Sequence, residues 1–276
     1  MHRGRRTRGA PHRRGRGPVV AGAEAGRAQR DRVSVRVRFL GTGNAFADGG
    51  RSHACIHLEA PGASLLLDCG GSSLPAIKRA MDPATIQAIA ISHLHGDHFG
   101  GVPYLVMEQF FAGRTTPLAI GGPRELEQRA TRAGAALYQD FFGKTAIEYG
   151  LSFVTLGETP VSLGGAEVSA HPVQHVAESD PHGLRVKIEG TLVAYSGDAR
   201  WSDELITVAK GADLFICEST NFSKADRAHL SYTELIANRA KLDCGRIILT
   251  HLGADAQAHL AEMELERAED GMLVTL

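Results

Sequence analysis

The sequence predicts an α+β protein in which two mixed β-sheets are packed between layers of helices. Two observations carry this prediction. Short apolar runs with strand-like patterns dominate the earlier part of the chain, and strands alternate with helical patterns in its final third. Because the helical segments fall between and after the strands, we expect them to cover the outer faces of the two sheets.

The domain is predicted to span residues 33–276 and to follow a segment of different chemistry. Residues 1–32 contain ten Arg against two acidic residues, which gives +8, whereas residues 33–276 carry −9 within a total of −1. The first segment is built from Arg, Gly, Ala and Pro, so we expect it to be disordered. Two hypotheses remain for it: a basic tail that contacts nucleic acid, or an upstream stretch included by a misplaced start site.

The first elements are predicted from local periodicity. Val33, Val35, Val37 and Phe39 alternate with polar residues and indicate a half-buried strand, which runs into the turn at 40–45. Segments 53–59 and 63–68 form a hairpin around Pro61-Gly62. Further along, we expect strands at 85–92 and 117–120 and helices at 73–81, 101–111 and 124–137.

The second half of the chain is predicted to build the second sheet. Segments 147–156, 161–168, 183–188 and 191–195 have strand patterns and are assigned to that sheet. The final third then alternates between helices at 203–210, 232–241 and 254–267 and strands at 214–217, 246–250 and 272–275.

The most informative stretch is SHLHGDHFGG at positions 92–101, directly after a predicted buried strand. It holds His93, His95, Asp97 and His98, and side chains of these types are costly to bury unpaired. Alternation places His93 and His95 on one side of the loop, whereas Asp97 and His98 face a neighbouring point, which suits two metal ions. Imidazole and carboxylate ligands without thiolate favour Zn²⁺, with Mn²⁺ or Fe²⁺ as alternatives.

This stretch resembles the signature of the metallo-β-lactamase fold hydrolases, and especially of their ribonuclease Z-like phosphodiesterase branch. The resemblance covers the chain from position 33 to its end. Supporting motifs occur in the family's order: LGTGNA at 40–45, LLLDCG with Asp68, HPVQHVAES with His175, YSGDAR with Asp198 and LTHLGAD with His251. The resemblance implies a four-layer αββα sandwich with a dinuclear metal site at the edges of the sheets.

The resemblance also implies a set of ligands. The first metal would be held by His93, His95 and His175, the second by Asp97, His98 and His251, and Asp198 would bridge the two. Asp97 is expected to serve catalysis as well, and Asp68 to orient a ligand histidine. Two Zn²⁺ ions at roughly 3.5–4 Å would generate a metal-bridging hydroxide as the nucleophile, without an organic cofactor.

A second pair of residues resembles the ribonuclease Z motifs that follow the bridging aspartate. By this resemblance Glu218 would orient His229, and His229 would stabilise the phosphoryl charge or protonate the leaving oxygen. The chain departs from the family at Cys217, Ser219 and Leu230. The alternative is that His229 is a surface residue beside a helix-capping serine.

The spacing and the charge bear on the substrate. Ribonuclease Z enzymes that bind tRNA carry a long arm between the third histidine motif and the bridging aspartate, but here only 23 positions separate His175 from Asp198. The body is acidic, which disfavours a broad polyanion-binding face. A small phosphodiester, such as a cyclic nucleotide or a nucleic-acid 3′ end, is therefore the expected substrate, and the resemblance also suggests a homodimer.

The sequence also bears on the location of the protein in the cell, and it leaves two alternative functions open. Apolar runs are too short for a membrane span and no signal peptide is recognisable, so we expect a cytoplasmic protein with reduced cysteines. The same fold could instead hydrolyse a thioester, lactone or carboxylic ester. A third reading is a non-catalytic, metal-stabilised nucleic-acid-binding protein.

Overall fold

The computed structural model describes residues 1–2, 4, 34–139, 141–142 and 144–276. The chain divides into two units, Met1–Arg32 and Val33–Leu276, and the second contains all of the described helices and strands. The expectation that residues 1–32 are disordered falls outside the described residues.

Two mixed sheets of seven strands each form the centre of the described domain, as the sequence predicts. The first has the order β14-β1-β2-β3-β4-β5-β6 and the second β13-β12-β11-β10-β9-β8-β7. The strands of the first sheet are β1 (Arg36–Gly41), β2 (Cys55–Ala60), β3 (Ala63–Leu67), β4 (Ala88–Ala90), β5 (Leu118–Gly122), β6 (Leu151–Thr155) and β14 (Leu273–Thr275). Those of the second are β7 (Val161–Leu163), β8 (Ala166–Pro172), β9 (His182–Ile188), β10 (Thr191–Tyr195), β11 (Ala212–Glu218), β12 (Cys244–Thr250) and β13 (Glu266–Arg267).

Each sheet joins an antiparallel part to a parallel part. Strands β14, β1, β2 and β3 pair antiparallel, and β3 to β6 pair parallel. The second sheet repeats this division, with antiparallel pairing from β7 to β10 and parallel pairing from β10 to β13. Parallel strands end at a common edge of the sheet, and this edge is where the functional side chains gather.

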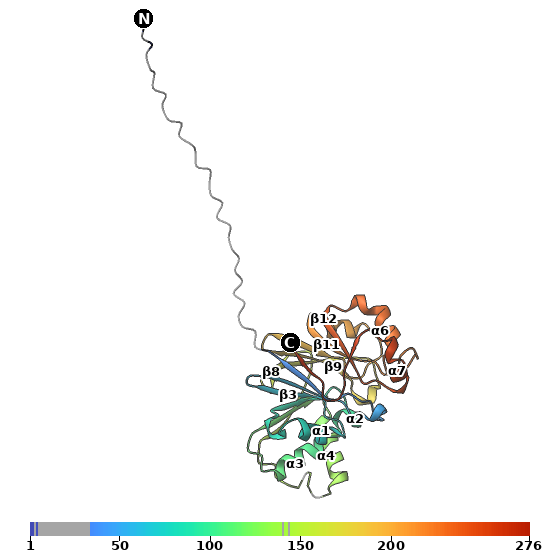
Figure 1. Ribbon diagram of the computed structural model, residues 1–276. Helices are drawn as coiled ribbons and strands as arrows, with labels where there is room; N and C mark the ends of the chain where they lie inside the picture. The colour runs from blue at the N-terminus through green and yellow to red at the C-terminus, as the bar shows by residue number, and fades with distance from the viewer. Residues whose placement is uncertain (3, 5–33, 140, 143) are drawn as a thin grey trace. The chain divides into compact units, whose positions relative to one another are not determined.

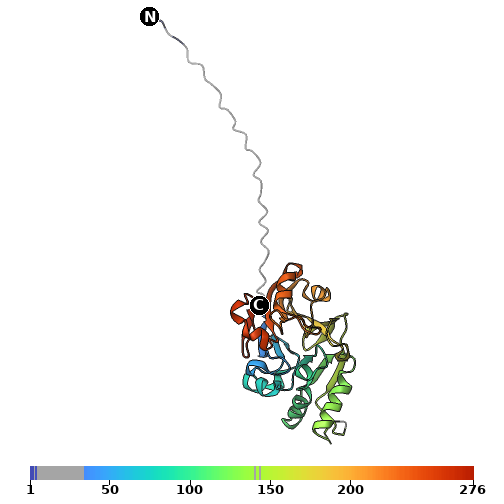
Figure 2. The ribbon, with the colours of Figure 1, turned by 90° about the vertical axis from the view of Figure 1, so that its right-hand side faces the viewer.

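Helices cover the outer faces of both sheets (Figure 1). In both views α1, α3 and α4 lie on one side of the sheets, and α6 and α7 lie on the other (Figure 2). The α-helices are α1 (Ser73–Ala80), α2 (Gly96–Phe99), α3 (Val102–Phe111), α4 (Leu126–Leu137), α5 (Glu204–Ala209), α6 (Tyr232–Asn238) and α7 (Ala254–Ala258). Short 3₁₀ turns lie at Asp48–Gly50, Pro83–Thr85, Ala177–Ser179, Arg239–Lys241 and Leu260–Glu262.

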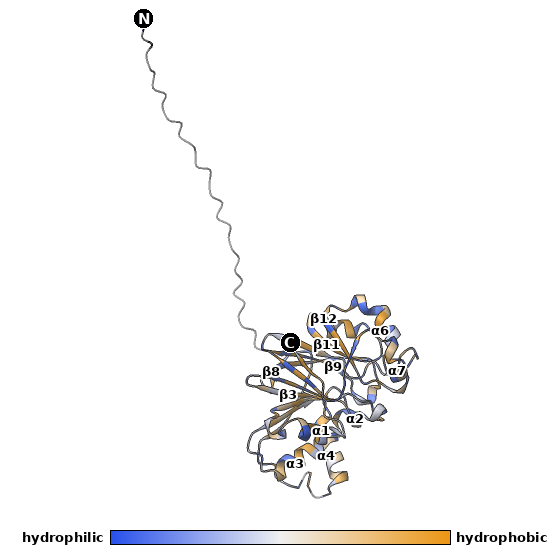
Figure 3. Ribbon diagram, in the orientation of Figure 1, coloured by the Kyte–Doolittle hydropathy of each residue, from blue (hydrophilic) through white to orange (hydrophobic). Residues whose placement is uncertain are grey.

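The alternation of side chains along the strands assigns each residue to one of three packed layers. Along β3, Leu65 and Leu67 join the core between the sheets, whereas Leu66 faces the layer of α1, α3 and α4. The second sheet packs its other face against α5, α6 and α7 through residues such as Phe215 and Leu235. Apolar colour accordingly follows the strands between the helical layers (Figure 3).

Three predicted elements differ from the structure. The strand within 147–156, β6, lies in the first sheet beside β5 rather than in the second. Segment 161–168 is divided between β7 and β8 because Gly164 and Gly165 have φ of 57° and 82° and form a turn. The helix expected at 254–267 ends at Ala258, and its last residues form β13 against β12.

Two further observations concern membrane-spanning helices and the state of the cysteines. Over the part of the chain that the structure describes, no helix has the length and apolar character needed to span a bilayer. All four cysteines have free thiols; Cys55, Cys69 and Cys217 are buried and Cys244 is half-buried. Burial raises the pKa of the three buried thiols, so these cysteines pack as small apolar side chains.

Candidate metal centre

The candidate centre lies where several strands of both sheets end. His93 follows β4, His175 follows β8, Asp198 follows β10 and His251 follows β12. The remaining three predicted ligands lie at the short helix α2: His95 is its N-cap residue, and Asp97 and His98 lie within it. Residues as far apart in sequence as His93 and His251, which are separated by 158 positions, thus lie at one edge, as expected where parallel strands end.

Near the centre two backbone segments approach each other closely, and two residues other than glycine have left-handed backbone conformations. Gly70 lies so near the carbonyl of Asp97 that a side chain at position 70 would collide with it. Asp68 and His251 have φ of 59° and 60°, in the left-handed region that residues other than glycine rarely adopt. Such conformations cluster at functional sites, where the surrounding structure enforces them.

The first group of side chains converges on one point. The Nδ1 atom of His95 lies 3.2 Å from Nε2 of His93 and 3.2 Å from Nε2 of His175. The Oδ2 atom of Asp198 lies 3.7 Å from Nε2 of His93 and 3.9 Å from Nε2 of His175. One ligand atom from each of these four residues lies within 4.8 Å of the others.

The second group shares Asp198 with the first. Its Oδ1 atom lies 3.2 Å from Nε2 of His98 and 3.4 Å from Nε2 of His251. The Oδ2 atom of Asp97 lies 3.3 Å and 3.2 Å from the same two nitrogens. Each oxygen of Asp198 therefore faces a different group, which is the arrangement expected of a bridging carboxylate.

Burial and charge set the protonation of these groups. Burial, reinforced by neighbouring histidines, lowers the pKa of His93 and His95, which keeps a lone pair available on each ring. Burial raises the pKa of Asp198, but His251 and His98 outweigh it and hold the pKa well below its usual range. The first group thus combines the neutral imidazoles of His93 and His95 with an ionised Asp198, whereas the carboxylates around His98 (Asp198, Asp68 and Asp97) outweigh its burial and raise its pKa.

The residues present fit a divalent metal ion. Nε2 of His98 and Oδ1 of Asp198 are buried and face each other, yet neither has a hydrogen-bond partner among the described residues. Buried polar atoms without a partner are costly, and a cation between them would satisfy both. Nitrogen and oxygen donors without a thiolate suit Zn²⁺, Mn²⁺ or Fe²⁺.

Asp68 organises one side of the centre and is fully buried. Its Oδ2 accepts hydrogen bonds from Nδ1 of His98 at 2.7 Å, from Oγ of Ser92 at 2.9 Å and from the hydroxyl of Tyr195 at 2.9 Å. Its Oδ1 accepts from the backbone N–H of Ser92 at 2.7 Å. Asp68 thus contacts a predicted ligand histidine in the way expected of an orienting carboxylate.

Glu218 and His229 form a third group next to the second. Nδ1 of His229 donates to Oε1 of the fully buried Glu218 at 3.0 Å. The side chain of His229 is 23% exposed and its Nδ1 lies 3.9 Å from Oδ2 of Asp198. Burial lowers the pKa of His229, but Glu218 outweighs it and raises the pKa to about 9. His229 is therefore a cationic group at the rim of the candidate centre.

Three hydroxyl-bearing residues of the site were missed by sequence reasoning. Ser92 and Tyr195 bind Asp68, and Thr220 binds Glu218 through its hydroxyl at 2.7 Å. Ser92 and Tyr195 lie within the motifs SHLHGDHFGG and YSGDAR, and Thr220 lies two positions after Glu218. The first two gave no local signal because Asp68 follows a different strand, and the contact of Thr220 with His251 joins parts of the chain that are 31 residues apart.

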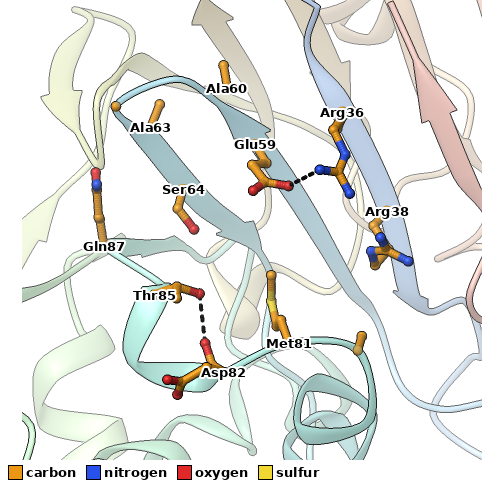
Figure 4. A pocket seen from close by; sticks show the side chains of 12 residues that line it. Arg36, Arg38, Glu59, Ala60, Ala63, Ser64, Met81, Asp82, Thr85 and Gln87 are labelled. Atoms are coloured by element: carbon orange, nitrogen blue, oxygen red, sulfur yellow. Dashed lines mark hydrogen bonds and ion pairs between the residues drawn. The ribbon is translucent and has the colours of Figure 1, made fainter.

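Hollows away from this centre contain none of the seven predicted ligands. One of about 390 Å³ lies on the outer face of the first sheet, where Arg36 pairs with Glu59 at 3.3 Å and Asp82 lies nearby (Figure 4). Another, of about 650 Å³, is lined by Leu94, whose neighbours on both sides are predicted ligands. Both hollows carry basic and acidic side chains together, so neither is a strongly charged surface.

Comparison with known proteins connects this geometry to a family. The sequence model of the family described as "Anti-Pycsar protein Apyc1" matches residues 35–269. A ribonuclease Z of Methanothermobacter thermautotrophicus is 28% identical over 87% of this chain and 93% of its own length. The uncharacterized protein Rv1339 of Mycobacterium tuberculosis is 32% identical over 80% of this chain and 81% of its own.

A solved structure gives the same fold. The metallo-β-lactamase fold protein YhfI from Bacillus subtilis superposes with a TM-score of 0.71 at 20% identity, covering 87% of this chain and 99% of YhfI. The predicted fold and the predicted resemblance are both confirmed. The chain belongs to the family of the anti-Pycsar protein Apyc1, and it is a ribonuclease Z-like protein of the metallo-β-lactamase fold.

Proposed function

We propose that this protein is a dinuclear metal-dependent phosphodiesterase that hydrolyses a small phosphodiester. The observation that carries the proposal is the position of Asp198, whose two oxygens face two separate groups of ligands. His93, His95 and His175 would hold one ion, and Asp97, His98 and His251 the other. Zn²⁺ is the preferred ion, with Mn²⁺ or Fe²⁺ as alternatives.

Two bound cations would acidify a water molecule and neutralise the charge on the phosphoryl oxygens. The chain's own residues then account for the leaving group. His229 is cationic and partly exposed beside Asp198, so it can protonate the oxygen that leaves phosphorus as the P–O bond breaks. Glu218 holds Nδ1 of His229 and so leaves its Nε2 as the proton donor.

The same pair favours phosphorus over carbon as the site of attack. A phosphodiester is anionic when it binds, so protonated His229 at the rim attracts it before it donates its proton to the leaving oxygen. A neutral ester, thioester or lactone gains less from this attraction. The relative named ribonuclease Z supports the phosphodiesterase reading, which comes to this chain as a proposal.

The proposed substrate is small. Between His175 and Asp198 the chain forms only a 3₁₀ turn and the strands β9 and β10, so this segment supplies no extended arm for a folded RNA. A cyclic nucleotide, or the 3′ end of a nucleic acid, needs contacts only around the metal centre. A homodimer and a contact of the basic residues 1–32 with nucleic acid are further proposals for the same protein.

The decisive experiment is a substrate panel with the metal-loaded protein. Bis-p-nitrophenyl phosphate, 2′,3′- and 3′,5′-cyclic nucleotides and precursor tRNA are compared with thioester and lactone substrates. We expect phosphodiester hydrolysis that chelation abolishes and Zn²⁺ or Mn²⁺ restores. Acyl hydrolysis without phosphodiesterase activity would overturn the proposal in favour of the ester, thioester or lactone reading. Full metal occupancy with no hydrolysis of any kind would favour the non-catalytic alternative.

A further inference from the structure

The hydroxyl of Thr220 lies among the side chains of the second and third groups. Its Oγ1 atom is 2.7 Å from Oε2 of Glu218, 3.0 Å from Nδ1 of His251 and 3.3 Å from Nδ1 of His229. Neither the sequence nor the proposed mechanism has given this residue a role. Because a hydroxyl has one hydrogen and two lone pairs, the direction of each contact can be assigned.

Glu218 determines that direction. Its Oε1 accepts from the backbone N–H of Ala199 at 2.8 Å and from Nδ1 of His229 at 3.0 Å, and its Oε2 accepts from the backbone N–H of Thr220 at 3.1 Å. A carboxylate used in this way is an acceptor on both oxygens. The Thr220 hydroxyl also lies 3.2 Å from the carbonyl of His251, but the 2.7 Å contact with the charged carboxylate is the shorter one and takes its hydrogen. Its oxygen is then left to accept the N–H at Nδ1 of His251.

The proton on Nδ1 decides what the other nitrogen of His251 can do. A neutral imidazole with hydrogen on Nδ1 has its lone pair on Nε2. That Nε2 atom lies 3.2 Å from Oδ2 of Asp97 and 3.4 Å from Oδ1 of Asp198, inside the second group. The opposite tautomer would direct an N–H at these positions and leave no lone pair for a cation.

We infer that Thr220 is a positioning residue of the metal centre, which sets the tautomer of His251 by linking it to Glu218. The inference rests on the proposed function, because it assumes that the second group holds a cation. It adds a residue that touches neither substrate nor metal. The carboxylate of Glu218 thereby fixes three parts of the site: it binds the loop after Asp198 and the side chain of His229 directly, and it binds His251 through Thr220.

The first sheet contains an independent instance of the same arrangement. Oγ of Ser92 donates to Oδ2 of Asp68 at 2.9 Å and lies 3.1 Å from Nδ1 of His93, whose Nε2 belongs to the first group. By contrast, His98 places its Nδ1 proton directly on Asp68, and His175 places its own on the carbonyl of Ala228 at 2.7 Å. In each case the Nε2 atom is left for the centre.

The backbone at position 220 is fixed independently of the hydroxyl. The N–H of Gly253 donates to the carbonyl of Thr220 at 3.0 Å, and the N–H of Ser219 donates to the carbonyl of Thr250 at 3.0 Å. Replacing Thr220 by Val should therefore keep the chain path and the side-chain volume while removing the hydrogen bonds. Thr220→Ser removes a methyl group instead and keeps the hydroxyl.

The test compares T220V and T220S with wild type and with a matched control, T191V. Thr191 is buried, whereas Thr220 is half-buried, and it lies at the end of β10 opposite to Asp198, away from the ligand groups. Competition of each protein with a chromophoric chelator gives the affinities for two Zn²⁺ ions. We expect T220V to bind one of the two ions about 10–100-fold more weakly, and T220S and T191V to bind both ions as wild type does.

A second readout identifies the nitrogen that carries the proton. Long-range ¹H–¹⁵N spectra of Zn²⁺-loaded protein distinguish Nδ1–H from Nε2–H for each imidazole, and His251 is assigned with a His251→Gln variant. We expect Nδ1–H in wild type and T220S, and loss of this uniform state in T220V. Circular dichroism and thermal unfolding check folding; if T220V is unfolded, an Nε2–H signal for His251 in wild type still overturns the inference.

The outcomes separate this inference from the proposed function. If T220V binds both ions with wild-type affinity and keeps the same tautomer, Thr220 has no positioning role, whatever the enzyme hydrolyses. If T220V loses one ion and T220S keeps it, the inference stands even when wild type hydrolyses no phosphodiester. That result would overturn the proposed function and leave the positioning role of Thr220 intact.

Discussion

Nδ1 of His229 donates a 3.0 Å hydrogen bond to Oε1 of Glu218, so a solvent-accessible imidazole is fixed by a carboxylate that has no exposure of its own. The ring of His229 also stacks on that of His251, with centroids 5.6 Å apart. A side chain held from two directions keeps one orientation relative to Asp198. This rigidity is what a proton donor at the edge of a reaction site requires.

His229→Ala is expected to lower kcat for a phosphodiester by about 10²–10⁴-fold, because it removes the proposed proton donor. The metal content should not change, since His229 is not among the seven proposed ligands. Steady-state kinetics together with metal analysis of the same samples check both parts. His182→Ala is the matched control, because the half-buried side chain of His182 contacts Asp180, through the carbonyl at 2.8 Å and the carboxylate at 3.9 Å, and is not a proposed ligand. Equal turnover of His229→Ala and His182→Ala would remove His229 from the mechanism.

Asp198→Ala is expected to abolish hydrolysis and to lower the metal content. Removing the carboxylate that faces both ligand groups takes one anionic ligand from each of the two proposed ions. Elemental analysis and the phosphodiester assay report the two effects, and Asp203→Ala, at an exposed position before α5, provides the control. Normal turnover at full metal occupancy would contradict the bridging assignment.

His57 makes the fold sensitive to acid at a place remote from the metal centre. It lies in β2 with 1% exposure, and its Nε2 contacts Oγ of Ser64 at 2.9 Å. Burial lowers the pKa of His57 from 6.5 to about 4, with Arg38 and Arg36 acting in the same direction against Glu59. Between these two values the unfolded chain binds a proton that the folded chain excludes, so stability falls as the pH drops from 6.5 towards 4.

The corresponding prediction compares wild type with His57→Gln by urea unfolding at pH 7.5 and pH 5. The loss of unfolding free energy between the two pH values should be about 2 kcal/mol smaller in the variant, because the glutamine has no proton to gain. Other titrating groups are common to both proteins and cancel in this difference. Identical losses would show that His57 titrates normally in the folded protein.

A chain that starts at Val33 is expected to retain the metal content and the kcat/KM of the full chain on a small phosphodiester. All seven proposed ligands lie between positions 93 and 251, and β1 begins at Arg36. Parallel assays of the two proteins, with unfolding curves for both, test this expectation. A shortened protein that folds but has lost its activity would show that residues 1–32 belong to the working enzyme.

Most of the fold could be predicted because its strands are marked by local patterns. Alternation along β1 and the Pro61-Gly62 turn between β2 and β3 depend on neighbouring residues only, and the structure contains both. Which of the two sheets a strand joins depends instead on which strand of each sheet still has an unpaired edge. Strand β6 pairs parallel with β5 through contacts such as Ile120 with Phe153, and no pattern within β6 specifies this partner.

The C-terminal error has a similar cause. Residues 254–267 are rich in helix-forming types, yet Arg246 of β12 forms a two-point ion pair with Glu266 at 2.6 and 2.8 Å and β13 joins the sheet. Tertiary pairing therefore outweighs helix propensity there. The motif at 92–101 shows the opposite case, because the ligand types and their spacing are local, and the structure brings all seven predicted ligand side chains together. The hydroxyl of Thr220 could not be predicted in this way.

The position of β14 has a consequence for biosynthesis. This strand pairs with β1, matching Thr275 to Arg36, so the earliest strand of the domain acquires its outer neighbour from the last one. While the domain emerges from the ribosome, β1 must present an unpaired edge until nearly all of the remaining elements have been made. Nascent chains stalled before β14 should therefore aggregate more readily than the complete domain and depend more on chaperones.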